Sequence, residues 1–225
     1  NGNTYTVPTE GNPTVISGEN GTLTVNVNGT YSYKADANTG GKADSFKFEI
    51  TDADNDKAEA TIDITISAAT GPTATTKVTV DEKGLFDSTD NSEIANVTVP
   101  GYTIVSGGDG TYGNISLVDG KWVYTLTGTF EHTGEGTDTA EDADTVTIKV
   151  KDAQGNTFNV DVKVDIKDAV PTISASDNLT AVSGNESETT GTLSHNFGAD
   201  GTGSLTVNGN TYTVPTEGNP TVISG

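Results

Sequence analysis

Three aspartates at alternate positions are the sharpest chemical signal in the sequence of 225 residues. Asp52, Asp54 and Asp56 fall in one short turn between two strand-like runs. Carboxylates at i, i+2 and i+4 match the first three ligand positions of an EF-hand loop, and Ca²⁺ takes about six to eight oxygen ligands. Carboxylates this close repel one another without a cation. The spacing predicts a Ca²⁺ site to which Glu59 adds an oxygen; a solvated acidic turn is the alternative.

Acids near the ends of a predicted domain suggest further cation sites. Asp152 lies in an equivalent turn, and Asp168 lies in the segment IKDAVP. We expect both near domain junctions, where a bound cation would fix the angle between domains. A second junction would draw on Asp81 or Glu82 together with the turn at 52–56. The alternatives are a plain Asx-turn and a solvated linker.

A third acidic group precedes a later strand. Its members are Glu131, Glu135, Asp138, Glu141, Asp142 and Asp144. A Ca²⁺ cluster that includes Asp144 is one interpretation, and an acidic solubilising loop is the favoured one. His132 and His195 are the only histidines. One imidazole per predicted domain is too few for a typical histidine metal site, and we expect no catalytic role for either.

Charge and composition exclude several classes of function. The chain has 11 lysines, no arginine and 32 acids, so its net charge is 11 − 32 = −21. Such a surface repels nucleic acid and anionic lipid. No apolar run approaches the length of about 18 residues that suggests a membrane-spanning helix. Without cysteine there is no disulfide and no thiol nucleophile.

The remaining motifs do not indicate an enzyme. The spacing of Gly108, Gly110 and Gly113 matches the dinucleotide fingerprint by letter, but no helix follows, so we interpret the match as accidental. The sequence has no G-x-S-x-G elbow. Trp122 and Tyr124 share one face of a predicted strand. An exposed platform there would indicate a carbohydrate- or partner-binding module, although a core position is favoured.

Two internal repeats organise the chain. Residues 1–18 recur unchanged at 208–225, an offset of 207 residues, which predicts one unit of a tandem array. A weaker repeat aligns 44–66 with 144–166 at an offset of 100 residues. Each 207-residue repeat is therefore expected to contain two related domains of about 100 residues, a usual domain size.

Alternating apolar residues predict strands throughout these domains. The clearest runs have Phe, Val or Ile at every second position, at 46–50, 62–66, 146–150 and 160–166. The dipeptides Asn28-Gly29, Asp119-Gly120 and Asn208-Gly209 read as hairpin turns. Frequent β-branched residues favour strands over helices. We predict an all-β fold of tandem antiparallel β-sandwich domains with essentially no helix.

Prolines at 72 and 171 mark the predicted boundaries between domains. They predict one complete domain at 71–169 and one split domain, with its front half at 170–225 and its back half at 1–70. The two halves lie at opposite ends of the chain, with the complete domain between them. We therefore expect them to pair between chains, in addition to the contacts of neighbouring repeats within one chain.

Several segments resemble the cadherin-like and bacterial Ig-like repeats of giant RTX adhesins, which Gram-negative type I systems secrete. They are GTYSY at 29–33, DSFKFEITDADND at 44–56 and LSHNFGADGTGSLTVNGNTYTV at 193–214. The resemblance implies Ig-like domains on the bacterial cell surface that act as a non-enzymatic extender. Such a stalk carries distal ligand-binding domains for adhesion and biofilm formation. It also implies Ca²⁺ at loops and linkers. The second domain departs from the pattern, because Gln154 and Asn156 replace Asp54 and Asp56.

Overall fold

The structure is a computed structural model that describes residues 5, 8–134, 136, 138–175, 179, 184, 190–198, 201 and 203–212. The chain divides into two compact units. Unit 1 comprises 1–73 with 101–103 and 151–158, and unit 2 comprises 74–100, 104–150 and 159–225. Most of the second copy of the 18-residue repeat, beyond Tyr212, lies outside the described residues.

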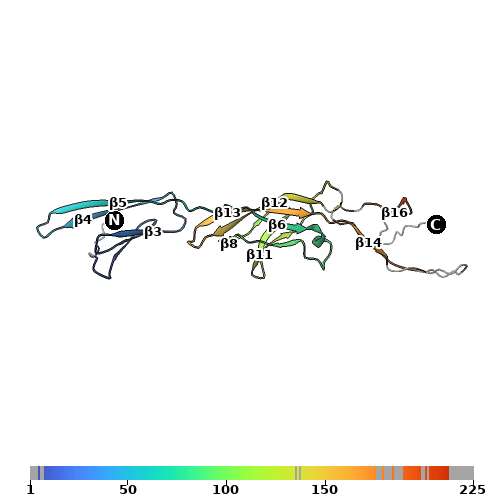
Figure 1. The fold of residues 1–225 in the computed structure, drawn as a ribbon, viewed down its shortest axis with the longest axis horizontal. Helices are drawn as coiled ribbons and strands as arrows, with labels where there is room; N and C mark the ends of the chain where they lie inside the picture. Colours follow the sequence, from blue (N-terminus) through green and yellow to red (C-terminus); the bar gives the residue numbers. More distant parts are fainter. Residues whose placement is uncertain are drawn as a thin grey trace. The chain divides into compact units, whose positions relative to one another are not determined.

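Unit 1 contains a three-stranded antiparallel sheet and a long hairpin. The sheet, in the order β1-β2-β3, consists of Thr14–Ser17, Gly21–Val25 and Tyr31–Ala35; β4 (Ala43–Thr51) and β5 (Lys57–Thr65) form the hairpin (Figure 1). The predicted alternation places Phe46 opposite Ile62 in the hairpin. Leu23, Phe46 and Ile66 are the buried apolar residues of this unit within the described part of the chain.

Unit 2 is built on two four-stranded sheets. One has the order β7-β11-β10-β9, and the other has the order β6-β13-β12-β8 (Figure 1). The first sheet consists of Ile94–Asn96, Lys121–Leu126, Gly113–Val118 and Gly108–Asp109, and the second of Thr76–Asp81, Thr157–Lys167, Thr139–Lys151 and Thr103–Ser106. The strand ends at 103, 151 and 157–158 are grouped with unit 1. Between them lies a core that includes Tyr124, Leu126, Val146, Ile148, Val162, Val164 and Ile166. Period-2 alternation explains why one face of each long strand is buried.

The predicted strands, turns and all-β class are confirmed. Asp119 and Gly120 both have positive φ between β10 and β11, as a tight hairpin turn requires. The one short helical element of the described residues is the 3₁₀ turn η1 (Glu82–Leu85). Towards the C-terminus lie two small antiparallel two-stranded sheets. One pairs β14 (Thr172–Ala175) with β15 (Leu193–Asn196), and the other pairs β16 (Leu205–Val207) with β17 (Asn210–Tyr212).

One strand pair departs from the antiparallel arrangement expected from the sequence. β6 and β13 run parallel, with Val78 opposite Val164 and Val80 opposite Ile166. They are the first and last strands of the eight that build the two sheets of unit 2. Because they run in the same direction, the chain enters these sheets at one end and leaves them at the other. The alternation of side chains alone does not distinguish this direction, since parallel and antiparallel strands share the same period.

Candidate functional site

The turn at 52–56 brings three carboxylates together at the tip of the β4–β5 hairpin. One oxygen each from Asp52, Asp54 and Asp56 lies within 4.8 Å of the others, and all three residues are exposed. Asp52 shapes the turn itself, because its Oδ1 accepts hydrogen bonds from the backbone N–H of Asp54 (3.2 Å) and of Asp56 (2.8 Å). Asn55 adopts positive φ to complete the turn. The donor set suits a hard cation that prefers oxygen ligands.

Hydrogen bonding keeps the first of these carboxylates ionised. The pKa of Asp52 lies below its usual value, first through a hydrogen bond with the Asp54 side chain and then through the backbone N–H of Asp56. Glu59 does not belong to this cluster. It lies within β5, opposite Glu49, and its carboxylate forms a 2.7 Å ion pair with Lys47.

The turn at 152–156 has the same backbone and a different chemistry. Asp152 Oδ1 accepts from the N–H of Gln154 (2.9 Å) and of Asn156 (2.8 Å), while Oδ2 accepts from the Asn156 side-chain amide (2.9 Å). Within unit 1, Asn38 also binds this turn, because its Oδ1 accepts from the N–H of Thr157 at 2.7 Å. The amide side chains of Gln154 and Asn156 thus stand at the positions that Asp54 and Asp56 hold in the turn at 52–56.

Asp144, predicted as a possible Ca²⁺ ligand, is the centre of a buried hydrogen-bond network. Its carboxylate accepts from the N–H groups of Thr111 (2.8 Å), Tyr112 (3.0 Å) and Thr145 (2.8 Å), and from the Tyr124 hydroxyl (2.8 Å). Burial acts to raise the pKa of Asp144, but these donors outweigh it and lower the pKa below its usual value. Burial and the neighbouring carboxylate also raise the pKa of Tyr124.

Unit 1 repeats this network around Asp44. Its carboxylate accepts from the Tyr33 hydroxyl (2.7 Å), from the N–H of Glu19 (3.2 Å) and from the N–H and side-chain amide of Asn20 (3.1 and 3.0 Å). Burial opposes ionisation of Asp44, yet the hydrogen bonds from Tyr33 and Asn20 hold its pKa below the usual value. The pKa of Tyr33 is raised to about 12, first by burial and then by Asp44.

Paired glycines make room for each buried carboxylate. A Cβ at Gly110 would lie 2.3 Å from Asp144 Oδ2, and a Cβ at Gly18 would lie 2.1 Å from Asp44 Oδ2. In both turns the first glycine donates its N–H to the carbonyl of a glycine three residues later, at 2.8 Å. Gly110 and Gly113, which are part of the apparent dinucleotide fingerprint, therefore have a structural role. The recurring Gly-x-x-Gly upstream of Asp44 and Asp144 was the signal that the sequence offered.

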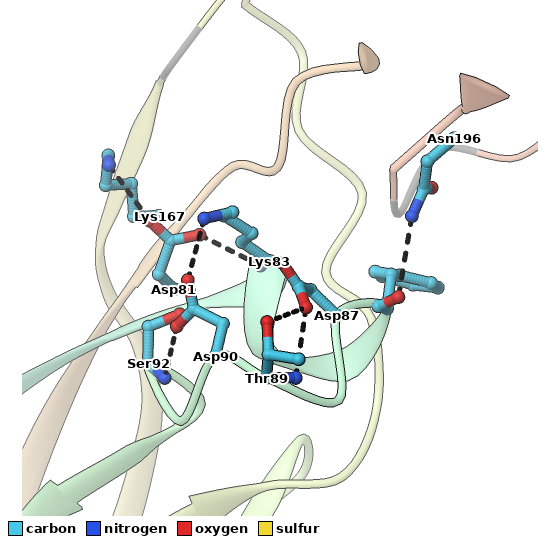
Figure 2. Close-up of polar contacts among 9 residues, drawn as sticks. Asp81, Lys83, Asp87, Thr89, Asp90, Ser92, Lys167 and Asn196 are labelled. Carbon is cyan, nitrogen blue, oxygen red and sulfur yellow. Dashed lines mark hydrogen bonds and ion pairs between the residues drawn. The ribbon is translucent and has the colours of Figure 1, made fainter. Parts of the chain in front are cut away.

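Asp81 takes part in a network of charged side chains at one end of unit 2 (Figure 2). One of its oxygens forms a 2.9 Å ion pair with Lys167, and the other accepts the N–H of Lys83 at the start of η1 (2.9 Å). Lys83 in turn pairs with Asp90 at 2.8 Å. This contact, followed by hydrogen bonds from Ser92, lowers the pKa of Asp90 to about 2. A lysine on each side thus already balances the charge of these aspartates.

Asp168 lies directly after β13, away from the Asp152 turn that precedes the same strand. The eleven residues of β13 separate the two, so a single ion does not reach both. The Asp168 side chain is buried instead beside Glu82 and His132. The sequence interpretation missed this combination, because it considered the three residues in separate motifs and expected no metal-binding role for a lone histidine.

The other candidates have ordinary surroundings. Lys77 bridges Asp142 (3.2 Å) and Asp165 (2.9 Å) on the surface of unit 2. Trp122 is half-buried in β11, and a Cβ at Gly107 would lie 3.2 Å from its ring.

No helix among the described residues has the length and apolar character to cross a membrane.

Comparison with known sequences finds a match over part of the chain. No curated protein matches the sequence significantly. Residues 2–65, which contain the Asp44 network and the Asp52–Asp56 turn, match the family described as the bacterial Ig domain, and this part of the chain is similar to that family.

Proposed function

We propose that this chain is a structural extender repeat of a bacterial surface protein, with a mechanical role rather than a catalytic one. The observation that carries the proposal is the parallel pairing of the first and last strands of the unit 2 sheets. Domains that the chain enters at one end and leaves at the other can follow one another in a line and so form a stalk. The 207-residue repetition and the similarity of 2–65 to bacterial Ig domains support the same role.

The stalk would project distal ligand-binding domains from the cell surface for adhesion and biofilm formation, with neighbouring repeats of the same chain as its partners. A net charge of −21 favours an extended chain of well-hydrated domains, because the units repel one another. Export by a type I system and membership of an RTX adhesin are part of the proposal through the resemblance of the sequence.

Calcium is the proposed cofactor of the turn at 52–56. The turn at 152–156 adopts the same hydrogen-bonded backbone with Gln154 and Asn156, so folding of the turn does not need carboxylates at 54 and 56. Three exposed carboxylates within 4.8 Å are instead suited to bind a cation. Ca²⁺ held there would offset two of the three negative charges of the turn and stabilise the folded hairpin by mass action.

A second copy of the chain is the proposed partner of unit 1. Within the described residues β4 and β5 form a two-stranded sheet, whereas β12 and β13 of unit 2 are flanked by β8 and β6. Ile50 is 71% exposed on this hairpin. The predicted front half of the split domain, 170–225, of another copy would add strands to the hairpin edge. Sedimentation velocity over a range of concentrations should show self-association; a monomer at every concentration contradicts this part of the proposal.

Calcium binding is tested by thermal unfolding in EGTA, in Ca²⁺ and in Mg²⁺, combined with small-angle X-ray scattering. We expect Ca²⁺ but not Mg²⁺ to raise the melting temperature of unit 1. Ca²⁺ should also narrow the distribution of interatomic distances obtained from scattering. The variant Asp54→Asn/Asp56→Asn keeps the Asp52 hydrogen bonds and should lose the response. Asp119→Asn, in the exposed β10–β11 turn, is the matched control. An unchanged response in the double variant contradicts the assignment of this turn.

A further inference from the structure

Three ionisable side chains from distant parts of the sequence meet inside unit 2. Glu82 opens η1, His132 belongs to the loop before β12, and Asp168 follows β13. One ligand atom from each lies within 4.8 Å of the others. The Glu82 and His132 side chains are 0% and 1% exposed, and Asp168 is 5% exposed. Two carboxylates buried this close are unfavourable unless a positive charge accompanies them.

The imidazole of His132 lies between carboxylates without forming a hydrogen bond to them. Nε2 lies 3.4 Å from Glu82 Oε2, and Nδ1 lies 3.8 Å from Asp138 Oδ2. Neither ring nitrogen makes a hydrogen bond within the part of the chain that the structure describes. Both distances exceed the usual N–H···O range of about 2.7–3.2 Å. The imidazole packs against Phe130 in a T-shaped arrangement, with the ring centroids 5.0 Å apart, which restricts its orientation.

The geometry points to a site for a divalent cation of the zinc class, with Glu82, Asp168 and His132 Nε2 as ligands. Ligand atoms about 2.0–2.1 Å from a tetrahedral zinc ion lie about 3.4 Å apart. The separation of His132 Nε2 from Glu82 Oε2 equals this value. Three protein ligands and one open position form a common zinc coordination set.

The donor set distinguishes this cation from calcium. Imidazole nitrogen suits zinc and its transition-metal neighbours, whereas Ca²⁺ takes oxygen ligands. Two carboxylates and one neutral imidazole also balance the two charges of the ion, so the buried site as a whole is neutral. This site is separate from the turn at 52–56, and it does not depend on the calcium proposal.

Surrounding groups hold the ligands in the way that metal sites require. Asp138 Oδ2 lies 3.8 Å from His132 Nδ1, so a small approach would let it accept a hydrogen bond from Nδ1–H and leave Nε2 for the metal. The N–H of Phe130 donates to Glu82 Oε1, which leaves Oε2 toward the imidazole. The Asp168 N–H donates to the Asp138 carbonyl at 2.9 Å, which ties the segment after β13 to the same loop.

A cation at this site would have a structural consequence for unit 2. Asp168 also lines a surface hollow of about 220 Å³ whose other walls include Asp81, Lys167 and Asn196. An ion entering there would join the start of η1, the loop before β12 and the end of β13. In a chain without cysteine, this cross-link has the role that a disulfide has elsewhere, because metal binding contributes directly to folding stability.

Zinc titration of the full chain, first freed of metal with EDTA, tests the site. We expect one Zn²⁺ per chain by calorimetry and a higher melting temperature for unit 2, followed by the fluorescence of Trp122. His132→Gln should abolish this binding, and Asp138→Asn should weaken it about tenfold or more. His195→Gln, which removes the other histidine, is the matched control and should bind as the wild type does. Asp54→Asn/Asp56→Asn should likewise leave zinc binding unchanged.

Nuclear magnetic resonance of the wild-type protein avoids any loss of folding in the variants. The chain has two histidines, so Zn²⁺ should shift the imidazole signals of one and leave those of the other in place. The inference is overturned if neither imidazole responds, if His132→Gln binds Zn²⁺ as tightly as the wild type, or if Ca²⁺ displaces Zn²⁺ at equal concentration.

Discussion

The turns at 52–56 and 152–156 share their backbone and differ in the groups that they present. In each, the first aspartate accepts the N–H groups two and four residues later, and the fourth residue has positive φ. One turn then adds two carboxylates, and the other adds an amide that hydrogen-bonds back to its own aspartate. The comparison distinguishes the residue that the turn needs in order to fold from the residues that can vary. The first aspartate builds the turn, and the third and fifth positions determine its chemistry.

The Asp44 and Asp144 networks give the opposite result. Both keep a buried aspartate, a tyrosine hydroxyl and a close glycine, although the surrounding sequences differ. Four donors converge on Asp144, so its replacement leaves several buried groups without a partner. Similarity at these positions reflects folding, whereas the difference at the turns matches the cation binding proposed for the turn at 52–56.

Replacement of the central carboxylate should have the largest effect. In Asp144→Asn the new amide presents hydrogens to backbone N–H groups that need an acceptor. We expect the free energy of unfolding of unit 2 to fall by about 3 kcal/mol, as for a lost charged hydrogen-bond network. Urea unfolding followed by Trp122 fluorescence measures it. Asp161→Asn, on the exposed face of β13, is the control, and Asp44→Asn should leave the Trp122 transition in place.

The glycine beside each aspartate should have the next largest effect. Gly110→Ala places a methyl group 2.3 Å from Asp144 Oδ2, and the turn cannot move without breaking the hydrogen bonds of Thr111 and Tyr112. We expect a loss of about 2 kcal/mol, typical of overpacking. Gly128→Ala, whose Cβ has its nearest neighbour at 3.8 Å, is the matched control. Equal melting temperatures of the two variants would show that the turn adapts.

Acid should destabilise both units through the same carboxylates. The pKa values of Asp44 and Asp144 are lower in the folded chain than in the unfolded chain. The stability that they contribute is therefore complete above the unfolded pKa, near 4, and is lost as pH falls through the folded pKa. The midpoint of unfolding, measured from pH 7 to pH 3, should fall as the pH decreases. In Asp144→Asn, the midpoint of unit 2 should depend less on pH. A profile identical to the wild type contradicts the role of Asp144.

Residue patterns predicted the strands and the tight turns because period-2 alternation and Asp-Gly or Asn-Gly dipeptides act locally. The run from Val160 to Ile166 predicted β13, and Asp119-Gly120 predicted the turn after β10. The parallel pairing of β6 with β13 depends on contacts between residues 86 positions apart in the sequence, such as Val78 and Val164 (164 − 78 = 86). Local patterns contain no information about that pairing.

The candidate sites show the same limit. Asp52, Asp54 and Asp56 are close because they share one turn, so their spacing sufficed to bring them together. Glu82, His132 and Asp168 come from the segments after β6, β11 and β13, and no spacing in the sequence predicts their distance. Asp144 appeared as one acid of a charged run, yet burial and four donors give it a structural role.

Exchange of side chains between the two turns should have the smallest effect on stability and the sharpest effect on binding. In Gln154→Asp/Asn156→Asp, the Asp152 turn gains the carboxylate pattern of 52–56 while its backbone hydrogen bonds remain. Asp at 156 also keeps an acceptor for the Asn38 N–H. Because both positions are near solvent, we expect little change of the melting temperature in EGTA. Calorimetry should then detect one additional Ca²⁺ per chain. The reverse exchange, Asp54→Gln/Asp56→Asn, should remove one. If neither exchange alters the number of bound Ca²⁺ ions, the carboxylates at the third and fifth positions do not determine binding, and the contrast between the two turns is one of solvation alone.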